Sequence, residues 1–344
     1  VWYKVGSSYE PSGLTGISHL LEHMMFKGTP EVPGSEFSRL IAANGGDENA
    51  FTGHDYTAYS QILGKDRLEL SFRLEADRIR YLLLKPEDVT RETQIVIEER
   101  RLRTEDQPEA LTHEQFNAAA YVVSPYRHPI IGWMQDIQSI TPDDLRRWYQ
   151  QWYAPNNATL IIVGDVDPAK VRDLAEKHFS SLPPSDRLTP KWTVEPPQLG
   201  ERRIIVKTPA GLPYVVLGYK VPTLKTATEA WEPYALTVLD CILGAGSSAR
   251  LSRSLVRGSQ IAAAIDTSYD PTSRLEELFI LAGNPAPGHS SAELEQALRV
   301  EVTRLRETFI NPDELARVIT QMVAADVYQQ DSIFYQGTQL GILE

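Results

Sequence analysis

One short segment, residues 16–27, constrains this chain more than any other. It reads Gly-Ile-Ser-His-Leu-Leu-Glu-His-Met-Met-Phe-Lys and follows a Pro-Ser-Gly turn, which predicts an amphipathic helix. At about 100° per residue, His19, Glu22 and His23 project from one face of this helix, within a turn of one another. Apolar residues lie between them, so these polar groups would be partly buried and would need partners.

This spacing suits a metal centre. Two imidazoles at positions i and i+4 fit tetrahedral zinc, and a carboxylate between them fits a general base beside the metal. The motif is H-x-x-E-H, the inverse of the commoner H-E-x-x-H. The alternative is an ordinary pair of core or surface histidines on an amphipathic helix.

A catalytic zinc ion needs a third protein ligand, and a long helix predicted at 86–104 offers one. Its apolar stripe is expected to comprise Val89, Ile95, Val96 and Leu102, and Glu92 and Glu99 fall within that stripe. Buried carboxylates are costly without partners, so Glu99 is the predicted third ligand and Glu92 a predicted support for a ligand. The alternative for both is an ion pair with an arginine of the same helix: Arg91, Arg100, Arg101 or Arg103.

The order of predicted elements indicates an α+β fold of two similar domains, each a sheet covered by helices. Strands are expected at 1–9, 48–51, 57–63 and 158–165 in the first half, and at 214–221, 261–269 and 275–282 in the second. We expect a zinc-bearing domain at 1–182, a Pro-rich linker at 183–200, and a repeated domain at 201–344 that is incomplete at its C-terminal end.

Composition excludes several classes of function. The net charge of −12 and the absence of a Lys/Arg cluster argue against a nucleic-acid partner. No apolar run is long enough to predict a membrane span. The single cysteine excludes an internal disulfide and a cysteine-based metal site.

With these residues in view, the chain resembles the pitrilysin/insulinase family of zinc metallopeptidases, the inverzincins, which includes the mitochondrial processing peptidase and its bacterial relatives. The family pattern is H-x-x-E-H followed far downstream by a glutamate, and Glu99 stands 76 positions after His23. The stretches 2–7, 26–29, 45–52 and 55–59 also match. The resemblance implies one zinc ion per chain and a peptide substrate that adds as a strand near Asn49 and Ala50. Asn49 could instead be a turn residue after Gly45-Gly46.

The resemblance also identifies a departure. Active members carry an arginine and, seven residues later, a tyrosine that help to hold the substrate and the oxyanion. Arg257 fits the first position, but Ala264 stands at the second and has no hydroxyl to donate. We therefore expect a heterodimer in which a homologous subunit supplies the Arg/Tyr pair; a homodimer is the alternative.

The predicted activity is peptide-bond hydrolysis, with Glu22 as general base for a water activated by zinc. The main alternative is a non-catalytic subunit of the same fold, like the core proteins of respiratory complexes. A quorum-signal lyase also uses H-x-x-E-H, but it is much shorter and needs cysteines that this chain lacks. The sequence does not determine the compartment: a bacterial periplasm or cytoplasm is favoured, and a mitochondrial matrix stays open.

Overall fold

The computed structural model describes residues 1–186 and 194–344, which fall into two compact units. Apart from 187–193, unit 1 comprises Val1–Ala110, Asn117–Pro197 and Ser332–Glu344, and unit 2 comprises Leu111–Phe116 and Gln198–Asp331. The boundary at 197–198 lies in the stretch predicted to be a linker. Residues 187–193 of that stretch lie outside the described residues, and its role as a linker stays a prediction.

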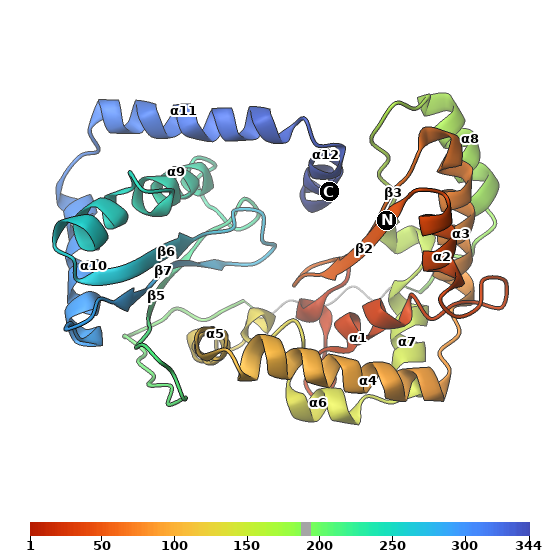
Figure 1. The fold of residues 1–344 in the computed structure, drawn as a ribbon, viewed down its shortest axis with the longest axis horizontal. Helices are drawn as coiled ribbons and strands as arrows, with labels where there is room; N and C mark the ends of the chain where they lie inside the picture. The colour runs from red at the N-terminus through yellow and green to blue at the C-terminus, as the bar shows by residue number, and fades with distance from the viewer. Residues whose placement is uncertain (187–193) are drawn as a thin grey trace. The chain divides into compact units, whose positions relative to one another are not determined.

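Unit 1 contains a four-stranded antiparallel sheet in the order β2-β3-β1-β4. Its hairpin is formed by β2 and β3, the predicted strands at 48–51 and 57–63, and β2 is an edge strand (Figure 1). The strands are β1 (Trp2–Tyr3), β2 (Asp47–Thr52), β3 (Thr57–Ile62) and β4 (Ala158–Thr159).

Two predicted strands are much shorter than expected. The first, at 1–9, is reduced to β1 because Gly6 leads into a 3₁₀ turn, η1 (Ser7–Tyr9). The second, at 158–165, is reduced to the two residues of β4. The two corrections have one cause, since β4 pairs only with the two-residue β1.

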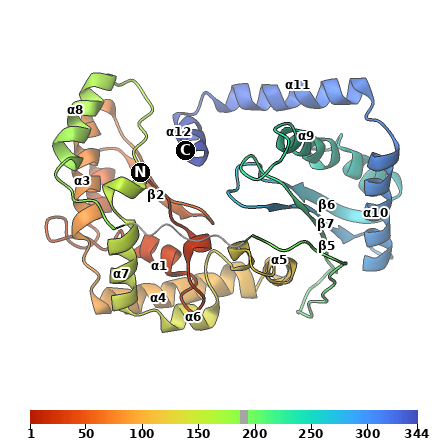
Figure 2. The same cartoon turned by 180° about the vertical axis from the view of Figure 1, so that it is seen from behind.

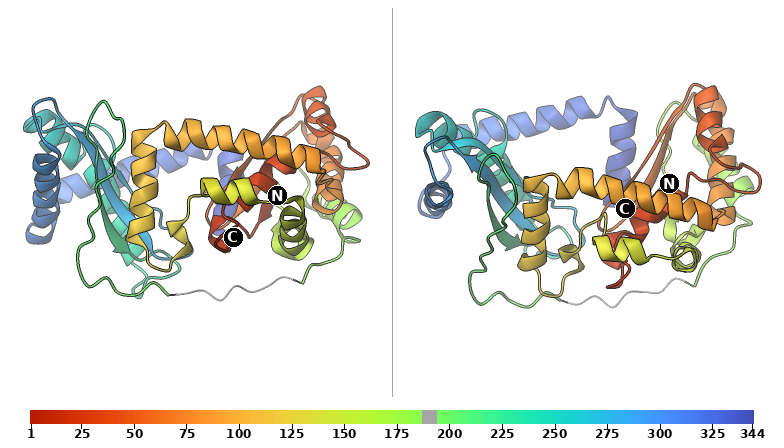
Figure 3. Two further views of the ribbon diagram at one scale, coloured as in Figure 1. Left: turned by 90° about the horizontal axis from the view of Figure 1, so that it is seen from below. Right: turned by 60° about the horizontal axis from the view of Figure 1, so that its bottom comes forward.

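Helices cover the sheet of unit 1 and bury a core into which α1 contributes its apolar residues. Figures 1 and 3 show α4 running alongside α1 and α6, and Figure 2 shows α8 beside α3. The helices are α1 (Ile17–Met24), α2 (Glu36–Ala43), α3 (Leu68–Tyr81), α4 (Pro86–Arg100), α5 (Pro108–Ala120, shared with unit 2), α6 (Met134–Ser139), α7 (Pro142–Trp152), α8 (Pro168–Phe179) and α12 (Ile333–Leu343).

The start of α1 is fixed by a buried carboxylate. Glu10 accepts hydrogen bonds from the backbone N–H groups of Gly16 (2.7 Å) and Ser18 (2.8 Å), which would otherwise be unpaired at the helix N-terminus. Gly16 has φ of 89°, and a Cβ there would lie 2.5 Å from the carbonyl oxygen of Ile131. Both constraints set where the helix begins, and therefore where its later side chains point.

The buried face of α4 differs from the predicted stripe. Val89 and Val96 are buried as expected, but Ile95 and Leu102 are exposed at 44% and 65%. The face turns instead toward Thr93 and Arg100, because Arg100 is buried and donates to the carbonyl of Gly132. Beyond Arg100 the predicted helix continues as a π-helical turn, η3 (Arg101–Glu105), which changes its period.

Unit 2 repeats the strand arrangement of unit 1. Its sheet has the order β5-β7-β6, so the second strand of the hairpin pairs with the earlier strand, just as β3 pairs with β1. Helices α9 and α10 contact this sheet, and α11 packs on α9. The two similar sheet-and-helix units confirm the α+β prediction. The elements are β5 (Val215–Val221), β6 (Ala262–Ser268), β7 (Glu277–Pro285), α9 (Glu232–Gly244), a π-helical turn η6 (Ser252–Gly258), α10 (Ser291–Glu307) and α11 (Pro312–Gln329).

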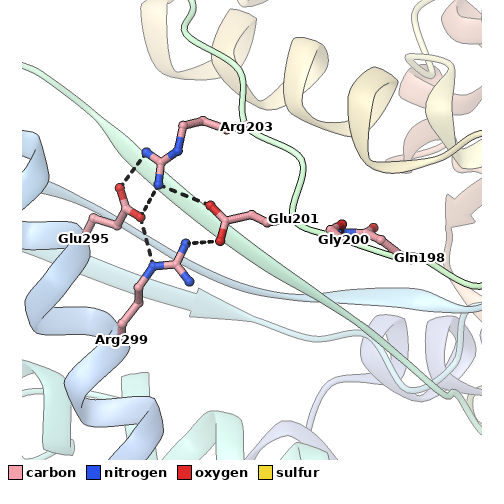
Figure 4. A network of polar contacts seen from close by, with 6 residues as sticks. All are labelled: Gln198, Gly200, Glu201, Arg203, Glu295 and Arg299. Atoms are coloured by element: carbon pink, nitrogen blue, oxygen red, sulfur yellow. Dashed lines mark hydrogen bonds and ion pairs between the residues drawn. The ribbon is translucent and has the colours of Figure 1, made fainter.

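An ion-pair network ties the start of unit 2 to α10 (Figure 4). Arg203 contacts Glu295 at 2.6 Å and Glu201 at 3.2 Å, and Arg299 contacts the same two carboxylates at 2.9 and 3.0 Å. Hydrogen bonds from Arg203 lower the pKa of Glu295 to about 2. Because most of these side chains are exposed, the network orients the segment more than it stabilises the unit. No helix in the described part of the chain is long and apolar enough to cross a membrane.

The cap on α1 makes a stability prediction. Glu10→Ala leaves two buried N–H groups without an acceptor, and we expect a loss of about 1–3 kcal/mol in the free energy of unfolding. Urea unfolding followed by tryptophan fluorescence measures it. Glu31→Ala, at an exposed carboxylate of the same unit, is the control and should change little. Equal stabilities for the two variants would contradict the role of Glu10.

Candidate metal centre

Helix α1 presents three polar side chains beside the apolar core: Glu22 is buried, and His19 and His23 are partly buried. His19 and His23 have ring centroids 4.9 Å apart, and Glu22 lies between them in sequence. Leu20, Leu21 and Met24 are fully buried, which fixes the rotation of the helix. The apolar residues therefore determine the direction in which the polar ones project.

Helix α4 brings Glu99 to the two imidazoles. Glu99 Oε2 lies 3.7 Å from His19 Nε2 and 3.5 Å from His23 Nε2. One ligand atom from each of the three residues lies within 4.8 Å of the others, the only such group of three or more His, Cys, Asp or Glu found among residues 1–186 and 194–344.

The donor set fits zinc. Two ligand atoms about 2.0–2.1 Å from a tetrahedral ion lie about 3.4 Å apart, close to the separations of Glu99 from both rings. These separations are long for direct hydrogen bonds. Two imidazole nitrogens and one carboxylate form a three-ligand combination that catalytic zinc sites use.

Burial and neighbouring charges set the protonation of the ligands. Burial, together with the nearby His23, lowers the pKa of His19 to about 4, so His19 is neutral and can offer a lone pair at neutral pH. Burial also acts to lower the pKa of His23, but contacts with Glu99 and Glu92 outweigh it and raise the pKa. Contact with His23 in turn lowers the pKa of Glu99, so this carboxylate is ionised.

Glu22 is held beside this group by the edge strand β2. Its Oε2 accepts a hydrogen bond from the Thr52 hydroxyl at 2.5 Å. Burial raises the pKa of Glu22, while the Thr52 hydrogen bond and the nearby His23 oppose the shift. A buried carboxylate with a raised pKa is a suitable proton acceptor at neutral pH.

The predicted arginine partners of the two glutamates are only partly present. Arg103 contacts the second oxygen of Glu99 at 2.9 Å, so Glu99 faces the histidines with one oxygen and an arginine with the other. Glu92 instead contacts Lys27 at 2.7 Å and His23 Nδ1 at 3.3 Å. Of the other arginines, Arg91 contacts Asp88, Arg100 contacts Glu105, and Arg101 contacts Glu98.

Sequence reasoning missed Lys27 and Thr52 as members of this centre. Lys27 lies four residues after His23 and within the helix predicted at 16–27, so its spacing was a usable signal, although α1 ends at Met24 and Lys27 lies just beyond it. Nothing in the sequence pairs Thr52 with Glu22, because their contact depends on how β2 passes α1.

The remaining predicted residues lie elsewhere. Asn49 and Ala50 are in β2, opposite Ser60 and Tyr59 of β3. In the described part of the chain β2 has one strand neighbour, β3, so it is an edge strand of the sheet. Arg257 is in unit 2, where it is exposed and donates to the carbonyl of Ser247, and its relation to the metal centre stays a prediction.

Comparison with known proteins identifies the class. The family model described as "Insulinase (Peptidase family M16)" matches residues 1–132, and the one described as "Peptidase M16 inactive domain" matches residues 139–322. All three candidate ligands and Glu22 fall within the first match. The chain belongs to the insulinase family of peptidases, family M16.

Similar proteins carry zinc protease names. The chain is 37% identical over 314 residues to "Zinc protease PqqE" of Helicobacter pylori, covering 89% of this chain and 68% of that protein. It is 28% identical to an "Uncharacterized zinc protease" of Rickettsia felis, covering 98% of this chain and 79% of the relative. A crystal structure of a protease from Helicobacter pylori matches with a TM-score of 0.94 and 32% identity, over 99% of this chain and 83% of that one.

Two adjacent glutamates of α4 test the ligand assignment. Glu99→Gln removes a charged ligand and should weaken zinc affinity by more than about 100-fold. Glu98→Gln changes the same group one residue away, where the side chain is 59% exposed and pairs with Arg101, and should leave the affinity unchanged. A competition titration against a chelator measures both, and equal affinities would remove Glu99 from the ligand set.

Proposed function

We propose that this chain is a zinc-dependent endopeptidase subunit in which His19, His23 and Glu99 hold one zinc ion. The observation that carries the proposal is the convergence of these three side chains from α1 and α4, with Glu22 beside them. The zinc protease names of the relatives support it.

In the proposed reaction the side chains of this centre divide the work. A bound zinc ion would supply Lewis acidity, polarising the scissile carbonyl and making water easier to deprotonate. Glu22 accepts the proton of the attacking water and passes it to the nitrogen of the leaving amine. Thr52 fixes the orientation of Glu22 through their hydrogen bond, and Glu92 fixes the ring of His23.

The edge of β2 is the proposed binding site for the substrate. An extended peptide that adds to this edge would pair with backbone groups near Asn49 and Ala50, so affinity would depend little on sequence. Thr52 of the same strand contacts Glu22, so a peptide bound along β2 would lie close to the proposed general base. Arg257 is proposed to contact the substrate.

The proposed functional unit is a heterodimer. Ala264 in β6 provides no hydroxyl at the position where the family resemblance places a tyrosine, so a homologous subunit would supply the Arg/Tyr pair. The alternative is a non-catalytic subunit of the same fold. It is less well supported, because such a subunit has no need for three convergent ligands and a base.

Substitution of the general base tests the mechanism. Glu22→Gln keeps the three ligands but cannot accept the proton, so we expect unchanged zinc content and a fall in turnover of about 10²–10⁴-fold. Metal analysis and cleavage of a fluorogenic peptide measure the two properties. Glu31→Gln is the control at an exposed carboxylate. Full turnover by Glu22→Gln would exclude Glu22 as the base.

The subunit proposal has its own test. The chain is purified alone and also together with any homologous subunit recovered from the same source, and peptide cleavage per zinc ion is compared. We expect the pair to be the more active preparation, since the partner adds oxyanion donors. Equal activity per zinc ion would show that the chain needs no partner.

A further inference from the structure

Lys27 is connected to the candidate metal centre through the carboxylate of Glu92. Its Nζ is 2.7 Å from Glu92 Oε1, while Glu92 Oε2 is 3.3 Å from His23 Nδ1. His23 Nε2 in turn faces Glu99 at 3.5 Å. The four side chains therefore form a continuous line of contacts from Lys27 to the predicted ligands.

Glu92 needs a cation because it is buried. Its side chain is only 4% exposed, and a buried carboxylate without a partner is strongly unfavourable. The arginines of its own helix that were candidate partners contact other carboxylates, whereas Lys27 contacts Glu92 directly. Lys27 is thus the lysine or arginine that pairs with the buried Glu92 carboxylate in the described residues.

The orientation of Glu92 determines which nitrogen of His23 is available. When Glu92 is ionised it can only accept, so a neutral His23 donates from Nδ1 in this contact and keeps its lone pair on Nε2. His19 differs, since its Nδ1 is buried and has no hydrogen-bond partner within residues 1–186 and 194–344. Within the described residues, His23 is therefore the histidine whose Nδ1 contacts a carboxylate, Glu92, and that carboxylate in turn contacts Lys27.

We propose that Lys27 is a positioning residue for the metal ligand His23, acting through Glu92 to hold the Nε2 lone pair toward the ion. The proposal rests on the proposed function only in taking His23 as a ligand. It assigns Lys27 no contact with metal or substrate. The Lys27 side chain is 30% exposed. The alternative role is a surface ion pair with Glu92 that does not affect the metal site. The two roles predict different zinc affinities for a Lys27 variant.

The test is zinc affinity of the full chain, measured by competition with a chelator and without any peptidase assay. Lys27→Met should weaken zinc binding about tenfold, because the Glu92 carboxylate loses the group that orients it. Lys27→Arg should restore most of the affinity. Lys65→Met removes an exposed ion pair with Asp165 and serves as the control, with no change expected.

A double-mutant cycle shows whether Lys27 acts through Glu92. Glu92→Gln should itself weaken zinc binding, and adding Lys27→Met to it should weaken binding little further. Full additivity of the two losses, or wild-type affinity in Lys27→Met, would overturn the proposal. Absence of zinc binding by the wild-type protein would instead overturn the proposed function.

A measurement on the wild-type chain needs no variant. Nitrogen NMR of labelled histidine should find the proton of neutral His23 on Nδ1, where Glu92 accepts it. A proton on Nε2 would contradict the proposal, even if Lys27→Met failed to fold.

Discussion

The structure of unit 1 depends on the packing of α1 against α4, which buries imidazoles and carboxylates beside an apolar core. Leu20, Leu21 and Met24 hold α1 in one rotation, and Val89 and Val96 do the same for α4. Polar groups that converge at such a junction are unfavourable unless something pairs with them. A divalent cation is the partner that this combination of donors suits best.

The rest of unit 1 supports that junction from several directions. Glu10 caps the start of α1, Thr52 on β2 donates a hydrogen bond to Glu22, and Glu92, which is paired with Lys27, contacts His23. These supports come from different parts of the chain, so the geometry of the centre depends on the folded unit and not on α1 alone. The edge strand β2 therefore connects the proposed peptide-binding edge with the proposed base.

The sequence predicted what depends on local periodicity and missed what depends on packing. The spacing of His19, Glu22 and His23 follows from one helix, and the α+β fold with two similar units follows from the order of elements. The predicted burial of Ile95 and Leu102 was wrong. Arg100 is buried and takes a position on the inner face of α4 where the periodicity predicted apolar residues. The lengths of β1 and β4 depend on each other, and the Thr52–Glu22 contact joins two elements, so neither could be read from one segment.

The central claim is that one zinc ion binds between α1 and α4. Anomalous diffraction at the zinc edge, from crystals of the full chain grown with zinc, tests it most directly. We predict one strong peak within bonding distance of Nε2 of His19, Nε2 of His23 and a carboxylate oxygen of Glu99. A well-ordered centre with no peak there, or a peak bound only by other side chains, would contradict the account.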